Sequence, residues 1–324
     1  MVTSSNQGFL AEATLPSESV FGTERTISGT LNDDRMRFDT SSASGPASND
    51  LIRGYDGNDT INGGRGDDWV SGGEGDDVLG DYAGNDHLFG EGGNDRLNGR
   101  QNKDWLDGGT GNDYLRGGNG RDTLLGGSGN DTLDGGNGAD TMLGGGNGDE
   151  MSGGSGRDSV DGGGGNDSLQ GGDGNDTLIG SRGDDTLEGG GGGDILIGGE
   201  GADVFLFTSA EDSIPGRSGR KLLYDEIRAP SDSEESTASA FDAEDIIDLS
   251  ALDADQLQDD DQAFAWGGIL NSSTRSIGTL YLRERKGETM LLANTDDDES
   301  WELKIEIEDG TRELLWYDSA NFIL

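Results

Sequence analysis

The strongest constraint on the fold is a nine-residue repeat that runs through the middle of the chain. In blocks of nine counted from Gly45, aspartate stands at position six and an apolar residue at position eight of eighteen consecutive blocks, without exception. A short period held over this length indicates a solenoid, in which each repeat buries its apolar side chain only by stacking on its neighbours. Residues 45–206 are therefore expected to form one repetitive domain.

Composition limits what this domain can do. The 324 residues include no cysteine and carry a formal net charge of −44, which disfavours nucleic acid and other polyanions as partners. Low hydrophobicity combined with high net charge is also typical of a disordered chain. With one inward apolar residue in every nine, burial alone does not offset the entropy of ordering the backbone. The repeats are thus expected to need a ligand in order to fold.

Each block divides into a loop and a strand. The first four positions are mostly glycine, which favours a tight turn whose carbonyl oxygens face a ligand. Position five is Asn or Asp in eleven of the eighteen blocks, and position six is always Asp. Oxygen ligands gathered on a flexible loop favour Ca²⁺ over Mg²⁺ or Zn²⁺. Positions seven to nine read x-apolar-x, which predicts a three-residue strand whose middle side chain points inward.

The pattern GGxGxDxUx, where U is large and apolar, resembles the calcium-binding nonapeptide of the repeats-in-toxin (RTX) proteins. The resemblance implies an all-β fold, a right-handed parallel β-roll solenoid with two nonapeptides per turn and about nine turns. It also implies Ca²⁺ ions between the loops of successive turns, with up to about 16 ions in all. Metal binding and folding are then expected to be one event, so the metal-free chain is expected to be largely disordered.

The residues expected to bind these ions, together with loop carbonyl oxygens, are the position-six aspartates. They are Asp50, Asp59, Asp68, Asp77, Asp86, Asp95, Asp104, Asp113, Asp122, Asp131, Asp140, Asp149, Asp158, Asp167, Asp176, Asp185, Asp194 and Asp203. Sites around Asp104 are expected to be weaker, because its block, GRQNKDWLD, has glycine at only one of its first four positions. A cation at position five, as at Lys103, Arg121 and Arg157, opposes metal binding further.

The outward positions seven and nine differ between the two faces of such a roll. One face carries an apolar row that includes Trp69, Phe89 and Trp105, whereas the other is mostly polar. An open apolar row of this size favours association. Two interpretations remain: the chain's own N-terminal and C-terminal regions cover the row, or the three aromatic residues contact a cell-surface or matrix partner or a second copy.

The regions on either side of the repeats do not follow the regular nonapeptide pattern. The segment 1–44 contains an irregular unit, GTLNDDRMR at 29–37, which is interpreted as a capping repeat, and it shows no cleavable signal peptide. Residues 207–324 resemble the C-terminal domain of the serralysin metalloproteases, which implies a β-rich cap. Within them, 211–241 is rich in Ser, Asp and Glu and is expected to be a flexible loop.

The last residues, 318–324, resemble the uncleaved C-terminal signal of bacterial type I secretion. The resemblance implies export by that machinery and an extracellular or cell-surface location. A chain that stays unfolded while Ca²⁺ is scarce suits such a route, because an unfolded chain can be threaded through an exporter.

Catalysis is not expected. A zinc protease of the serralysin type needs HExxH, and this chain has one histidine, His87, at an outward strand position that indicates an ordinary surface side chain. The sequence therefore favours a secreted calcium-binding protein with a structural, adhesive or matrix role. The alternatives are a non-catalytic accessory module of an exported hydrolase system and a small membrane-active RTX protein.

Overall fold

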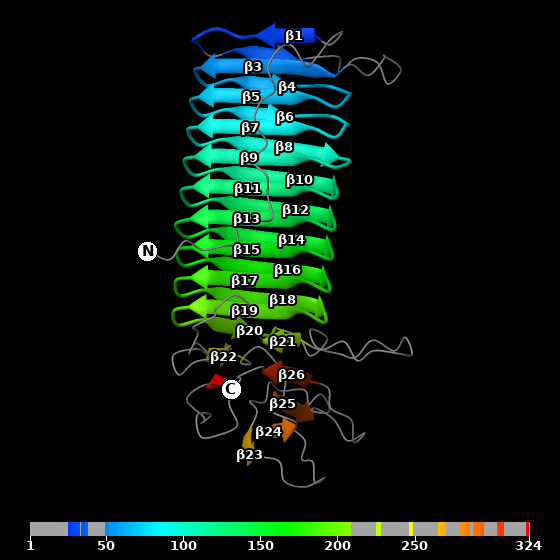
Figure 1. Cartoon of the computed structure of the whole chain (residues 1–324), viewed down its shortest axis with the longest axis vertical. Coiled ribbons are helices and arrows are strands. Elements are labelled where there is room, and N and C mark those ends of the chain that lie inside the picture. The colour runs from blue at the N-terminus through cyan, green and yellow to red at the C-terminus, as the bar shows by residue number, and fades with distance from the viewer. Residues whose placement is uncertain are drawn as a thin grey trace, which may run out of the picture.

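A computed structural model of the chain describes residues 25–32, 34–37 and 49–208, together with the backbone of seven strands beyond residue 208. Every regular element in these ranges is a β-strand. The strands stack into a column of two parallel sheets, and the chain passes from one sheet to the other at each loop (Figure 1). Within the described residues no helix is long and apolar enough to cross a membrane. The all-β parallel roll expected from the repeat is confirmed.

The first sheet has fifteen strands. Those before residue 208 are β1 (Arg25–Ser28), β3 (Asp50–Asp56), β5 (Trp69–Glu74), β7 (His87–Gly92), β9 (Trp105–Thr110), β11 (Thr123–Ser128), β13 (Thr141–Gly146), β15 (Ser159–Gly164), β17 (Thr177–Arg182) and β19 (Ile195–Glu200). They follow one another in this order across the sheet, so each turn of the chain adds one strand to it.

The second sheet has twelve strands. Those before residue 208 are β2 (Arg35–Arg37), β4 (Thr60–Asn62), β6 (Val78–Gly80), β8 (Arg96–Gln101), β10 (Tyr114–Gly120), β12 (Thr132–Gly138), β14 (Glu150–Gly156), β16 (Ser168–Gly174), β18 (Thr186–Gly192) and β20 (Val204–Leu206). Most strands exceed the three residues expected, because they continue into the first positions of the following block.

Pairing is parallel with an offset of two nonapeptides. In the second sheet Leu115 pairs with Leu133, and Leu133 pairs with Met151, so each step is 18 residues along the chain. The position-eight side chains of both sheets point inward and form one core that runs the length of the column. All eighteen, from Ile52 to Phe205, are at most 2% exposed, which confirms the predicted inward position.

Glycine is required where the loop turns. In the block 126–134, Gly127 has φ 108° and Gly129 has φ 134°, a left-handed conformation that side chains other than glycine rarely adopt. The block 99–107, which lacks glycine at these two positions, keeps the turn by placing Arg100 and Asn102 at φ 70° and 79°. The loss of glycine therefore leaves the backbone path intact and adds local strain.

The unit at 29–37 adds one further half-turn at the N-terminal end of the column. Strand β2 pairs with β4, and the backbone N–H of Asp34 donates a 2.7 Å hydrogen bond to Oδ1 of Asp59. The sequence offset of this bond is 25 residues, so the seven residues 38–44 interrupt the period without shifting the stacking.

Seven strands extend the two sheets beyond residue 208. They are β21 (Asp225–Ile227), β22 (Ile246–Asp248), β23 (Ala265–Ile269), β24 (Thr279–Arg285), β25 (Glu288–Asn294), β26 (Leu303–Ile307) and β27 (Phe322–Ile323). Strands β21 and β22 pair in parallel with β19 and β20, whereas β24–β25 and β25–β26 are antiparallel pairs. Strand β21 lies inside the predicted loop 211–241, whose other residues are outside the described part of the chain. Apart from β27, the predicted secretion signal at 318–324 is also outside it.

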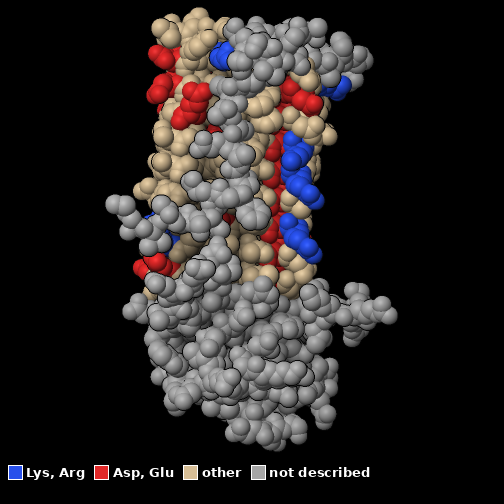
Figure 2. Space-filling model, in the orientation of Figure 1, with Lys and Arg blue, Asp and Glu red and all other residues tan. Residues whose placement is uncertain are grey.

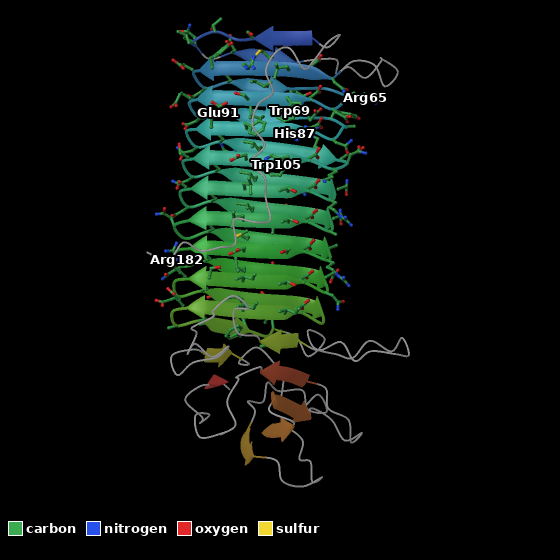
Figure 3. The ribbon with its side chains drawn as sticks, in the orientation of Figure 1. Arg65, Trp69, His87, Glu91, Trp105 and Arg182 are labelled. Atoms are coloured by element: carbon green, nitrogen blue, oxygen red, sulfur yellow. The ribbon has the colours of Figure 1, made fainter. Side chains whose placement is uncertain are left out.

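The aromatic row lies on the outer face of the first sheet, as Figure 3 shows for Trp69, His87 and Trp105. It is less open than the sequence indicates: Phe89 is only 6% exposed, and Trp69 and Trp105 are half-buried. His87 is not an ordinary surface side chain either, because it is half-buried and stacks on Trp69. Of the three aromatic residues proposed as an interface, Phe89 is thus not available for contact as the structure stands.

Candidate metal centre

The position-six aspartates form one ladder along each edge of the roll. One ladder begins at Asp50 and the other at Asp59; we call these the Asp50 edge and the Asp59 edge. In each ladder the backbone N–H of one aspartate donates to Oδ1 of the aspartate 18 residues later, as Asp113 does to Asp131 at 2.8 Å. The bonds of this kind from Asp50 to Asp203 measure 2.6–3.0 Å. One carboxylate oxygen of each of these accepting aspartates, Oδ1, therefore serves to hold neighbouring turns together.

The other carboxylate oxygen has no such role. In fourteen of these aspartates Oδ2 is buried and receives no hydrogen bond from the part of the chain that the structure describes; these are Asp68, Asp77, Asp86, Asp95, Asp104, Asp113, Asp122, Asp131, Asp140, Asp149, Asp158, Asp167, Asp176 and Asp185. A buried carboxylate oxygen without a partner is costly. Its repetition along both edges indicates that the Oδ2 atoms serve a ligand.

In the described blocks other than 81–89, glycine at position one leaves space in front of the Oδ2 atom. A Cβ placed on Gly126 would lie 2.5 Å from Oδ2 of Asp131 and 2.6 Å from the carbonyl oxygen of Gly144 in the next turn. A carboxylate oxygen and a carbonyl oxygen thus converge on the same small space. These are the hard oxygen donors that Ca²⁺ takes as ligands, so the residues fit the ion.

Burial changes the acidity of these carboxyl groups. Loss of solvation, followed by neighbouring carboxylates, raises the pKa of Asp95 and Asp140 to about 7, and the same loss of solvation raises that of Asp122 to about 6. The backbone hydrogen bond from the preceding rung acts in the opposite direction and lowers each pKa. A row of buried carboxylates at neutral pH therefore needs protons or cations to compensate its charge.

Position five forms a second, exposed ladder that the sequence did not predict. On the Asp59 edge the N–H of Asn112 donates to Oδ1 of Asn94 at 2.9 Å, and the N–H of Asn130 donates to Oδ1 of Asn112 at 2.7 Å. Asn94, Asn112 and Asn130 therefore link neighbouring turns, and all three are exposed at the surface. Their 18-residue spacing in the sequence is the signal that could have revealed this role.

The two edges differ in charge at position five. Lys103, Arg121 and Arg157 all precede strands of the first sheet and hence lie on the Asp50 edge. Figure 2 shows basic side chains gathered along one edge beside a column of acidic side chains. The ladder itself continues past them, because Asp104 both donates to Asp122 and accepts from Asp86 at 2.9 Å. The hydrogen-bond ladder is therefore unchanged at Asp104, and the weaker sites expected there stay a prediction that depends on the charge at position five.

One buried carboxylate was missed altogether. Asp81 occupies position one, where the other seventeen blocks from Gly45 have glycine, and it is 0% exposed. Its carboxylate lies with those of Asp68 and Asp86, and one oxygen from each of the three is within 4.8 Å of the others. The departure from glycine was the signal for this residue.

Comparison with known proteins places the repeats in a family. A model of the RTX calcium-binding nonapeptide repeat (4 copies) matches residues 45–79, 82–115, 107–142, 116–151, 143–178 and 170–205. No curated protein sequence matches the chain. Among solved structures, the chain is similar to the solution structure of the AlgE6R3 subunit from the Azotobacter vinelandii mannuronan C5-epimerase. That match has 27% identity and a TM-score of 0.35, and it covers 52% of this chain and 78% of the other.

Proposed function

The chain belongs to the family of RTX calcium-binding nonapeptide repeat proteins, and from this premise we propose that its roll folds when Ca²⁺ binds along both edges. The observation that carries the proposal is the pair of buried Oδ2 rows, whose atoms receive no hydrogen bond from the described residues. The position-six aspartates from Asp50 to Asp203 would hold the ions together with loop carbonyl oxygens. Bound Ca²⁺ supplies the positive charge that lets these carboxylates lie buried and close together.

The same charge balance makes the roll dependent on metal. Neighbouring strands lie about 4.8 Å apart, so like charges face one another along each edge at about that spacing. A ligand that binds only the folded state stabilises it in proportion to its concentration. We therefore propose a chain that stays unfolded where Ca²⁺ is scarce and folds after it leaves the cell, where it has a structural, adhesive or matrix role.

Far-ultraviolet circular dichroism of the full chain tests metal-coupled folding. Strand signal should be weak in a chelator, should appear on addition of Ca²⁺, and should disappear again when the chelator is in excess. Mg²⁺ at the same concentration serves as the control, because it demands stricter octahedral geometry and gives up water reluctantly. Strand signal that does not change with the chelator would contradict the proposal.

Export needs its own experiment. The full chain and a variant without residues 318–324 would be expressed with a bacterial type I exporter, and both would be quantified in the medium and in the cells. We expect the full chain outside and the shortened chain inside. A control that lacks 211–217 removes the same number of residues from outside the proposed signal. Equal export of the full chain and the 318–324 deletion would exclude this segment as the signal.

A further inference from the structure

The first sheet contains one loop that departs from the repeat at the position closest to the metal-binding oxygen. In the other blocks from Gly54 onward, glycine at position one leaves space in front of Oδ2. In the block 81–89 that residue is Asp81, which is fully buried. The backbone still holds the loop against its neighbour, because Tyr82 N–H donates to the Gly64 carbonyl at 3.0 Å and Gly66 N–H donates to the Ala83 carbonyl at 3.1 Å.

The carboxylate of Asp81 faces the same space as the ladder aspartates on either side. A Cβ placed on Gly63 would lie 2.7 Å from Oδ2 of Asp68 and 2.9 Å from Oδ2 of Asp81, so both oxygens border the space that this glycine leaves open. Asp86 completes the group, with one oxygen of each residue within 4.8 Å of the others. Within the residues that the structure describes, no other group of three metal-ligating side chains is this close.

The three carboxylates are closed off from solvent and lie against one another. Asp68, Asp81 and Asp86 are each 0% exposed, and their Oδ2 atoms receive no hydrogen bond from the described residues. Two ionised carboxylates cannot hydrogen-bond to one another, so only a shared proton or a cation compensates such a group. Oδ1 of Asp81 is already occupied, since it accepts from the backbone N–H of Tyr82.

We propose that Asp68, Asp81 and Asp86 form a three-carboxylate Ca²⁺ site that is tighter than the other sites of the roll and fills first. The affinity of a Ca²⁺ site rises with the number of charged ligands and with its rigidity. The ordinary sites draw their carboxylates from position six alone, whereas this one gains a third carboxylate from position one. The inference rests on the proposed calcium-dependent folding and adds an order of filling to it.

The test compares Ca²⁺ binding by the full chain and by two variants. Asp81→Asn keeps the shape of the side chain and removes its charge, and Asp81→Gly restores the residue found in the other blocks. Asp134→Asn is the matched control, because it removes one carboxylate from the outer face, where Asp134 pairs with Arg116 at 3.2 Å. Equilibrium dialysis with radioactive Ca²⁺ measures bound against free ion, and circular dichroism follows folding on the same samples.

We expect the unmodified chain and Asp134→Asn to bind a first ion at a free Ca²⁺ concentration at least about tenfold below that of the remaining ions. Both Asp81 variants should lose this first step while retaining the later binding and the strand signal. An unchanged first step in Asp81→Gly, or a single affinity class in the unmodified chain, would overturn the three-carboxylate site alone. A chain that binds no Ca²⁺ at all would overturn the proposed function together with it.

A steric variant provides a second, independent measurement. Gly63→Ala places a methyl group between the oxygens of Asp68 and Asp81, whereas Gly80→Ala meets its nearest atoms at 3.7 Å and 3.8 Å and serves as its control. The first binding step should weaken in Gly63→Ala and persist in Gly80→Ala. A first step that survives in both variants would contradict the proposed position of the ion.

Discussion

The imidazole ring of His87 lies parallel to the indole ring of Trp69, with 3.9 Å between the ring centroids and 5° between the ring planes. The two residues are register partners on β5 and β7, and Trp105 is the next partner along the same row. Stacking of this kind follows from the 18-residue offset, which places the seventh position of every second block side by side. The stacking of His87 on Trp69 can therefore be used as a probe of whether the first sheet is assembled.

His87 is the only histidine in the chain, so its titration can be followed by nuclear magnetic resonance without assignment of other imidazoles. Burial, and then the positive charge of Lys103, lower the pKa of His87 below its ordinary value of 6.5, while Asp67 opposes them. We expect a midpoint below 6.5 with Ca²⁺ bound and a midpoint near 6.5 in chelator. This group therefore contributes stability above pH 6.5 that is lost as the pH falls through its folded pKa.

The variant Lys103→Gln supplies the control for His87. It removes the second cause of the lowered pKa, so the midpoint with Ca²⁺ should rise while the stack with Trp69 is kept. Identical midpoints with Ca²⁺ and with chelator would show that His87 does not enter the stacked, half-buried environment on folding.

Much of this arrangement is predictable from the repeat. An invariant apolar residue every nine positions predicts the inward positions, as the burial of Leu115 and Leu133 illustrates. Alternation of blocks between two sheets predicts that Trp69 and Trp105 share a face. These features are predictable because a given position of the nonapeptide has the same role in every block, so the sequence pattern alone is enough to assign that role.

Other features depend on how neighbouring turns meet and were therefore not predicted. A template that expects glycine at position one treats Asp81 as a mismatch, although its side chain meets Asp68 from the preceding turn of the same edge. The interruption at 38–44 likewise hides the contact of Asp34 with Asp59. In both cases the two residues are separated by a number of positions that is not a multiple of nine, so the repeat alone does not place them together.

Removing one ladder charge should shift calcium-dependent folding. In Asp131→Asn the side chain can still accept from the N–H of Asp113, but the charge facing the proposed ion is lost. We expect the free Ca²⁺ concentration at the folding midpoint to rise about threefold to tenfold, since affinity depends on ligand charge. Circular dichroism against free Ca²⁺ measures it.

Asp134→Asn is the control for that variant, because it removes a carboxylate three residues away on the outer face, where the side chain is 34% exposed. An exposed ion pair contributes little to stability, so the midpoint should stay close to that of the unmodified chain. If both variants shift the midpoint equally, the effect is one of net charge and Asp131 has no particular role.

Acidity should oppose calcium binding. Loss of solvation raises the pKa of Asp95 and Asp140 to about 7 and that of Asp113 to about 6 in the metal-free roll. Because these folded pKa values exceed the unfolded value of about 4, their contribution to metal-free stability is fully present below the unfolded pKa. It is lost as the pH rises through about 6 to 7. Metal-free chain should therefore show more strand signal at pH 5 than at pH 8.

In metal-free chain that is already folded at pH 6, calcium must displace these protons, so its binding should release them and its affinity should increase with pH. Titration calorimetry in two buffers of different ionisation enthalpy measures the number released, and repetition at pH 8.5 is the control in which release should be much smaller. Equal heats in the two buffers at pH 6 would contradict a buried carboxylate ladder that is protonated before the metal binds.

The last test concerns the core. The position-eight side chains that form it are separate from the proposed metal ligands, so a substitution there changes burial without removing a ligand. Leu115 on β10 is 0% exposed, and it pairs with Leu97 and Leu133 on either side. Replacing it with alanine removes buried methyl groups and leaves a cavity, which costs about 2–5 kcal/mol. Leu125→Ala on the outer face of β11 is the control, since that side chain is only half-buried. Denaturant unfolding at saturating Ca²⁺ measures both free energies, and equal losses in the two variants would show that the inward row does not carry the core.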